Sequence, residues 1–226
     1  MKTQIAMLAV WASVLTAQMT TTQTLDLPPE GALRFPRSIG EMTIEGWDLP
    51  RVEIIVVKSV KPGYDEKDAA KWLQRVSVHA ERRGNDIAVD TVYPKRFLLA
   101  RPFRDGGLSP IELEYRVKAP RNARLAIEHQ SGEVHLEFLT GDIRVTNGRG
   151  QISLYLLNGP YAIDARSKLG EVDSDFPGPE RRRLGLGHSY LEQASGAASK
   201  IYLRIGFGDI TILKRQQPEE PAPAKK

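Results

Sequence analysis

The residues whose types and spacing could do chemistry are acids that follow glycines. A phrase of Gly, then an acid or amide, then an aliphatic residue recurs through the second half of the chain, and its acids are Glu133, Asp142, Glu171 and Asp209. Some nine-residue β-rolls bind Ca²⁺ at such corners, but they need two glycines and an Asp in each corner to supply several oxygens to one ion. Here each corner offers one acid, and Gln151 and Pro160 interrupt the row. We therefore expect these side chains to hydrogen-bond corner amides or to face water, without binding a metal.

Two histidines raise the question of a transition-metal site. His129 and His135 lie near Glu128 and Glu133, and imidazole and carboxylate groups are ligands that Zn²⁺ accepts. However, His135 is out of phase with the apolar residues on either side of it, so its side chain should point to solvent. The sequence predicts no metal site here.

The familiar catalytic motifs are incomplete or missing. The stretch from Gly187 to Leu191 begins like the nucleophile elbow of serine hydrolases, but Leu191 stands where the second glycine belongs. The sequence contains neither a phosphate-binding loop nor a dinucleotide fingerprint. It also contains no cysteine, which excludes disulfides, thiolate metal sites and a cysteine nucleophile. We expect no catalytic residue and no cofactor.

Positive charge in two loops gives the best binding hypothesis. The chain has a formal charge of +4, and loss of Lys2 with a signal peptide would leave one charge fewer. For an exported protein this favours an anionic glycan, a lipid head group or another envelope protein over nucleic acid. The alternative is that these loops are simply solvated. The predicted binding residues are Lys95, Arg96, Arg101, Arg104, Arg181, Arg182 and Arg183.

The elements that must position these residues are short strands. Glycines 132, 141, 150 and 159 are nine residues apart, and apolar and polar side chains alternate after each one. Alternation with a period of two is typical of a strand with one buried face, and a glycine supplies the positive φ of a tight corner, as we expect of Gly141. The spacing fits either a solenoid of stacked coils or a meander of antiparallel hairpins. Repeated phrases in the same order favour the all-β solenoid or roll, in which apolar positions form continuous internal columns.

The remainder of the chain divides by composition. Lys2, an apolar run over residues 5–15 and the small residue Ala17 predict a cleaved signal peptide, and the run is too short to span a bilayer comfortably. We expect export to the periplasm, cell surface or medium, with no transmembrane segment after cleavage. The predicted parts are a signal peptide (1–17), a polar lead-in (18–30), a β part with one short helix near 65–74 (31–120), a glycine-repeat solenoid part (121–214) and a disordered tail (215–226).

Several of these phrases together resemble a known family. The stretches 40–48, 115–120 with 131–134, 140–143 and 206–212 are similar, in this order, to the bacterial putative-adhesin domains built from β-strand repeats. The resemblance implies an elongated β-solenoid or roll outside the cytoplasm and carries no catalytic residues. It favours a non-catalytic adhesin-like binding scaffold of the envelope. The alternative is a carbohydrate-active enzyme that acts on an acidic glycan with carboxylates on the outer face of a β-solenoid, which a row of exposed acids in a groove would favour.

Overall fold

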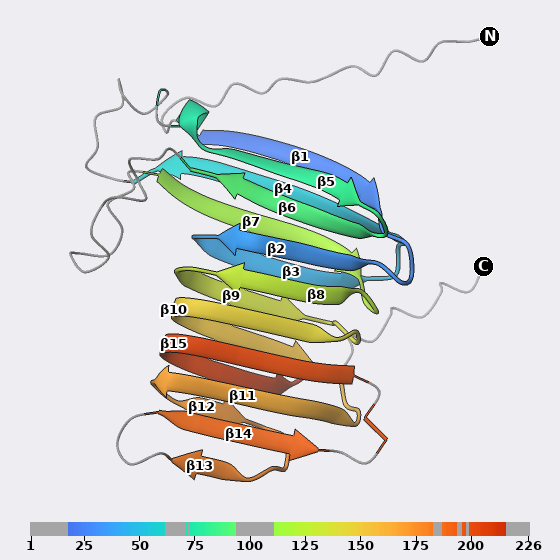
Figure 1. Ribbon diagram of the computed structural model, residues 1–226, viewed down its shortest axis with the longest axis vertical. Coiled ribbons are helices and arrows are strands. Elements are labelled where there is room, and N and C mark those ends of the chain that lie inside the picture. Colours follow the sequence, from blue (N-terminus) through green and yellow to red (C-terminus); the bar gives the residue numbers. More distant parts are fainter. Residues whose placement is uncertain are drawn as a thin grey trace, which may run out of the picture.

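The computed structural model describes residues 18–61, 71, 73–93, 111–182, 187–193, 196–197 and 199–215, and these form an all-β fold (Figure 1). Helix is confined, in this part of the chain, to Lys71 and residues 73–75, and most of the helix expected near 65–74 lies outside the described residues. No helix among the described residues is long and apolar enough to span a bilayer. The strands are β1 (Gln18–Asp26), β2 (Ala32–Ser38), β3 (Glu41–Trp47), β4 (Arg51–Val60), β5 (Ser77–Arg83), β6 (Asp86–Val92), β7 (Ile111–Pro120), β8 (Arg124–His129), β9 (Gly132–Glu137), β10 (Ile143–Leu156), β11 (Tyr161–Leu169), β12 (Val172–Ser174), β13 (Glu180–Arg182), β14 (His188–Gln193) and β15 (Ser199–Lys214).

The strand order overturns the predicted solenoid or roll. All the strands join one sheet whose main path is β1-β4-β7-β3-β9-β10-β15-β11-β14-β13, which is nearly closed and barrel-shaped. A solenoid stacks its coils in chain order, but here the last strand, β15, lies between β10 and β11, and β3 lies between β7 and β9. The meander alternative also fails, because most of the central pairs are parallel. The repeat was a sound indicator of buried faces and bends, but alternation within a strand carries no information about its neighbours.

Two long strands connect the two walls of this sheet. The first part of β10 (143–147) pairs with β8 and its second part (150–155) pairs with β9, and β15 follows both parts of β10 in register. The first wall therefore contains β5, β6, β2, β8, the first parts of β10 and β15, β11, β14 and β13. The second wall contains β1, β4, β7, β3, β9, the second parts of β10 and β15, and β12. Figure 1 shows the two walls as two layers of strands.

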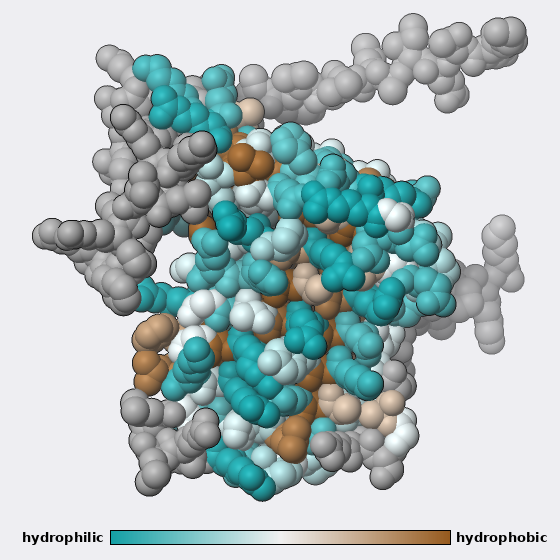
Figure 2. Space-filling model, viewed as in Figure 1, coloured by the Kyte–Doolittle hydropathy of each residue, from teal (hydrophilic) through white to brown (hydrophobic). Residues whose placement is uncertain are grey.

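The core fills the space between the walls. Alternate side chains of each strand point inward, and register places them in continuous columns, while hydrophilic side chains cover much of the outer face in Figure 2. Each such buried aliphatic side chain stabilises the fold by roughly 1.5–3 kcal/mol. One column of the first wall contains Ile87, Leu33, Leu125, Ile143, Ile201 and Ile163, and one of the second wall contains Tyr115, Met42, Val134, Ile152, Ile210 and Val172, all no more than 4% exposed.

The bends between the walls are built on stacked glycines. At Gly150, φ is 128° and a Cβ would lie 2.0 Å from the carbonyl oxygen of Gly132, so no side chain fits. Buried polar side chains bond the glycine carbonyls of this column: His129 Nε2 lies 3.0 Å from Gly40 O, and Asn147 Nδ2 donates to Gly132 O at 2.9 Å. The stacked column, in spatial order, is Gly40, Gly132, Gly150, Gly208 and Gly170.

Gly141 corrects the sequence-based expectation of a positive φ. It is absent from the residues with positive φ among the described part of the chain. Its hydrogen is nevertheless required, because a Cβ there would meet the carbonyl oxygen of Ala123 at 2.2 Å. The requirement at Gly141 is therefore space and not backbone conformation.

The polar lead-in predicted at 18–30 contains strand β1, which its sequence pattern does not indicate. β1 pairs with β4 on one side, and on the other side Gln23 bridges to β5 of the first wall. The Gln23 side chain donates from Nε2 to Val78 O at 3.2 Å and accepts at Oε1 from Ala80 N at 3.0 Å. One side-chain amide thus takes the place of a strand between the edges of the two walls.

Candidate anion-binding groove

A cavity of about 910 Å³ lies at the β11–β14 end of the sheet and is rich in positive charge. Among the described residues, four cationic side chains and one carboxylate line it, which gives these residues a formal charge of three positive units if histidine is neutral. We call this cavity the basic groove. Its charged lining residues are Arg166, Lys168, Arg181, Arg204 and Asp164.

Strand register explains why these side chains gather. Thr146 of β10 pairs with Arg204 of β15, Arg204 with Arg166 of β11, Arg166 with Ser189 of β14, and Ser189 with Arg181 of β13. Adjacent strands are about 4.8 Å apart, so three guanidinium groups and two hydroxyl groups are spread over five neighbouring strands. The inward positions that flank Arg204 and Arg166 are buried, which turns these arginines to the outer face.

Asp164 holds two of the arginines in place. Its carboxylate accepts from Arg166 Nε at 3.0 Å and Nη2 at 3.2 Å, and from Arg204 Nη2 at 2.6 Å. The Arg204 guanidinium also lies 3.6 Å from the centre of the Tyr202 ring, and its side chain is only 19% exposed. Guanidinium groups fixed in this way present planar N–H donors that match phosphate, sulfate and carboxylate oxygens.

Among the described residues that line the groove, no serine hydroxyl is hydrogen-bonded to a histidine or carboxylate base. The stretch that resembles a nucleophile elbow is the regular strand β14, in which His188 and Ser189 are consecutive residues and both line the groove. Ser189 Oγ donates to the carbonyl oxygen of Arg181 at 3.5 Å. Burial raises the pKa of Tyr190 to about 12, and its hydroxyl lies 3.1 Å from Phe176 O, so this group stays protonated.

The binding residues predicted from the sequence are placed by the structure as follows. Arg181 lines the groove, and the backbone of Arg182 pairs with His188 in the neighbouring strand. The Arg182 side chain and the other five predicted residues (Lys95, Arg96, Arg101, Arg104 and Arg183) lie outside the described part of the chain. The sequence pattern did not single out Arg166 and Lys168 of β11 or Arg204 of β15, because each is separated from the next cation by other residues and their adjacency depends on the strand order.

Three acids of the repeat phrases, Glu133, Glu171 and Asp209, adjoin strands of the second wall, whereas Asp142 precedes the first part of β10 in the first wall. Glu133 pairs with Gln151, and Gln151 pairs with Asp209. Glu41 pairs with Glu114 and lies next to Glu133, because the following residues, Met42 and Val134, pair with each other. As expected, acids bond corner amides: Asp209 Oδ1 accepts from Glu171 N at 2.7 Å, and Asp142 Oδ1 from Lys200 N at 2.8 Å. None of these acids lines either cavity.

The histidines do not assemble a metal site in the described part of the chain, where no group of three suitable ligands occurs. His129 is 3% exposed, and its ring nitrogens lie 2.8 Å from Ser38 Oγ and 3.0 Å from Gly40 O. Burial lowers its pKa to about 4. His135 lies on the outer face beside the Tyr155 ring, at 4.7 Å between ring centres.

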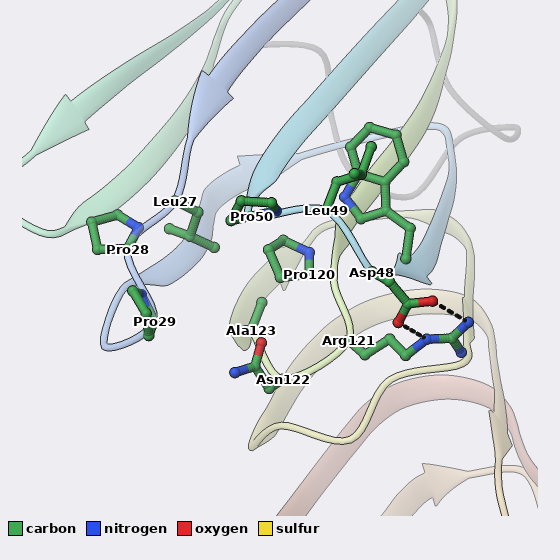
Figure 3. A pocket seen from close by; sticks show the side chains of 11 residues that line it. Leu27, Pro28, Pro29, Asp48, Leu49, Pro50, Pro120, Arg121, Asn122 and Ala123 are labelled. Carbon is green, nitrogen blue, oxygen red and sulfur yellow. Dashed lines mark hydrogen bonds and ion pairs between the residues drawn. The ribbon is translucent and has the colours of Figure 1, made fainter.

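A second cavity of about 330 Å³ lies where the loops after β1, β3 and β7 meet (Figure 3). Leu27, Pro28, Pro50 and Pro120 make most of its lining apolar, as Figure 3 shows. Arg121 at its rim is held by Asp48, with Nε 2.7 Å from Oδ1. Its charges are thus paired within the protein, in contrast to the excess of cations in the basic groove.

Comparisons with known proteins give structural neighbours without a family. No family model matches the chain, and no curated protein matches it. A putative cell adhesion protein from Clostridium sporogenes is similar at 13% identity and a TM-score of 0.47, covering 87% of this chain and all of that one. A putative adhesin from Bacteroides fragilis is similar at 8% identity and a TM-score of 0.26, covering 86% of this chain and 97% of that one. A putative lipid binding protein from Parabacteroides distasonis is similar at 9% identity and a TM-score of 0.23, covering 88% of this chain and 95% of that one. These TM-scores lie below 0.5, so the likenesses do not assign this chain to a family.

Proposed function

We propose that the protein is a non-catalytic, adhesin-like binding protein that works outside the cytoplasm and holds anionic groups of envelope material in its basic groove. The observation that carries the proposal is the row of Arg204, Arg166 and Arg181 with two hydroxyl groups between and beside them. Asp164 orients two of these arginines and cancels one of the positive charges around the groove. The remaining cations are available for phosphate, sulfate or carboxylate groups of a ligand.

The position of the acids favours binding over glycan cleavage. A glycosidase needs two carboxylates on either side of a bound sugar, in a site that encloses the reacting bond. Here the acidic row that contains Glu133 and Asp209 follows the outer face of the second wall. Of the described residues that line the basic groove, one is a carboxylate, Asp164, and it is bonded to two arginines. This arrangement supports a binding surface.

The test uses a soluble polyanion and a matched pair of variants. Dextran sulfate is the probe and neutral dextran the control, with binding measured by calorimetry at low and high salt. Arg166→Gln combined with Arg181→Gln should weaken binding about tenfold or more, because each lost charged hydrogen bond contributes roughly 1.5–3 kcal/mol before solvent screening. Salt should weaken wild-type binding, because exposed charges are screened over roughly 10 Å at 0.1 M.

The control variant removes equivalent charges elsewhere. Arg116 on the second wall pairs with Glu114 two residues away, as Arg166 does with Asp164, and Lys118 is its exposed neighbour. Arg116→Gln with Lys118→Gln should leave polyanion binding unchanged. Equal binding by both double variants would show that net charge, and not the groove, attracts the polyanion.

The compartment has its own experiment. Cell fractionation with mass spectrometry should find a mature chain outside the cytoplasm that lacks about the first 17–20 residues, as expected of a cleaved signal peptide. Recovery of cytoplasmic protein with Met1 intact would contradict export.

A further inference from the structure

The bends of β10 and β15 display one residue each between two glycines. These are Arg149, between Gly148 and Gly150, and Phe207, between Gly206 and Gly208. Phe207 pairs with Arg149 on one side and with Leu169 of β11 on the other. We call Arg149, Phe207 and Leu169 the corner ridge.

The ridge exposes large apolar side chains that are held outward. Phe207 is 49% exposed and Leu169 is 40% exposed. A Cβ at Gly206 would lie 2.5 Å from Gly148 O and one at Gly208 would lie 1.8 Å from Gly150 O, so the backbone on both sides of Phe207 packs closely against β10. Figure 2 shows apolar side chains protruding from the left edge of the molecule, at the height where Figure 1 places the bends of β15 and β11.

Cationic side chains lie on one side of Phe207 and Leu169. The Arg149 guanidinium lies 5.6 Å from the centre of the Phe207 ring, and Lys168 directly precedes Leu169. Lys168 also lines the basic groove, so the ridge and the groove are continuous. Across the ridge, Asp209 and Glu171 begin the acidic row of the second wall. The ridge therefore divides a basic face from an acidic one.

We propose that the basic groove and the corner ridge together dock on the surface of an anionic lipid bilayer. Phe207 and Leu169 enter the boundary between head groups and acyl chains, and Arg149, Lys168, Arg166 and Arg181 contact the lipid phosphates. Apolar side chains flanked by cations are the combination that binds peripheral proteins to anionic membranes. The acidic row fixes the orientation, because it must turn away from the negative surface. The inference rests on the proposed function and names the source of the anionic groups.

The shape of the ridge favours a bilayer over a protein partner. Phe207 and Leu169 protrude from a convex bend, and a protein would need a matching pocket to bury them. A bilayer accepts separate protruding side chains without a preformed pocket, and the aromatic ring of Phe207 suits its interfacial region. A protein partner is the competing outcome of the experiment.

The experiment measures flotation with vesicles of phosphatidylcholine and of phosphatidylcholine mixed with phosphatidylglycerol. The wild-type protein should bind the mixed vesicles and not the phosphatidylcholine vesicles. Phe207→Ser with Leu169→Ser should reduce this binding about tenfold or more, the effect of withdrawing two large apolar side chains from the interface. The same variant should keep its affinity for dextran sulfate, because its groove cations are intact.

Matched controls make each outcome decisive. Met19 and Leu49 are 41% and 42% exposed and lie away from the ridge, in β1 and in the loop after β3. Met19→Ser with Leu49→Ser should bind mixed vesicles like the wild type, and melting curves of both double variants verify folding. In addition, Phe207→Trp should show a blue shift of tryptophan emission on mixed vesicles that Met19→Trp does not show.

The results separate the two proposals. Wild-type binding to dextran sulfate without binding to mixed vesicles would overturn the membrane inference and leave the anion-binding function standing. The ligand would then be an anionic protein or glycan. Vesicle binding that survives the loss of Phe207 and Leu169, or that is equal on phosphatidylcholine alone, would also overturn it. Failure to bind either probe would defeat both proposals.

Discussion

Replacement of Gly150 by alanine tests the stacked-glycine column. Alanine at two other glycines separates the cost of backbone conformation from the cost of steric contact. At Gly150 both conditions hold: φ is 128°, and the new Cβ would lie 2.0 Å from the carbonyl oxygen of Gly132. At Gly84 φ is 66° and nothing lies within 4 Å of the new Cβ. At Gly141 φ is not positive, but the Cβ would lie 2.2 Å from Ala123 O.

The expected losses of unfolding free energy follow from these two terms. Gly84→Ala pays only for an L-residue in the left-handed backbone conformation, which costs about 1–2 kcal/mol. Gly141→Ala carries the contact alone, and forced overpacking of this kind costs about 1–3 kcal/mol. Gly150→Ala carries a sparsely populated φ together with a contact against backbone that is itself stacked on further glycines, so we expect roughly 2–6 kcal/mol.

Urea unfolding followed by circular dichroism measures the three values, with linear extrapolation to water. The order should be Gly150→Ala well above Gly141→Ala and Gly84→Ala. A loss at Gly150 no larger than that at Gly84 would refute the column, because it would mean that adjacent bends separate freely. If Gly150→Ala does not fold at all, its yield against that of Gly84→Ala decides the same question.

Three further predictions concern other parts of the fold. The pKa of His129 is about 4 in the folded chain and about 6.5 in the unfolded chain, so between these pH values only the unfolded chain binds the proton. The free energy of unfolding should therefore be highest above pH 6.5 and fall by about 1.4 kcal/mol per pH unit towards pH 4. Urea unfolding should find this slope reduced in His129→Gln but not in the exposed His79→Gln. Gln23→Leu should cost about 1–3 kcal/mol by leaving Val78 O and Ala80 N without their partner and should increase aggregation in light scattering, whereas the neighbouring exposed Thr22→Val should do neither. Asp164→Asn should leave the groove with one more positive charge but less ordered arginines, so dextran sulfate should bind with a steeper salt dependence in calorimetry; an unchanged salt slope would argue against contact between the polyanion and this cluster.

The sequence predicted strands better than their arrangement. The strands expected after glycines 132, 141, 150 and 159 lie within β9, β10 and β11, because alternation of apolar and polar residues describes one buried face. β1 was missed because none of its side chains is buried and only Gln23 and Leu25 are half-buried, so its sequence has no clear alternation of apolar and polar residues. The sheet order was missed for a different reason: it depends on which of several similar apolar strands meet, and the repeat makes these strands nearly equivalent.

For the candidate site, too, the sequence indicated features within one segment but not the contacts between distant strands. Arg181 was found because three arginines in succession are conspicuous in a sequence, whereas Arg166 and Arg204 are 38 residues apart and meet through the parallel pairing of β11 with β15. The acids after the glycines were expected to stand singly at corners. Glu133 and Asp209 instead share a row with Gln151, because the same glycine column that bends the strands also aligns the residue that follows each glycine.

The central position of β15 constrains the order in which the molecule can be assembled. This strand is near the C-terminal end of the sequence, yet it lies between β10 and β11 in the first wall and between β10 and β12 in the second. β1 to β10 can pair with one another as the chain emerges, but β11 and β12 join them only through β15, which follows all the other described strands in the sequence. A chain released before residue 199 would expose the edges of β10 and β11, with their unpaired amides and carbonyls, to any extended segment nearby. The late arrival of β15 is therefore the step at which premature termination or a competing strand would divert this protein from its native structure.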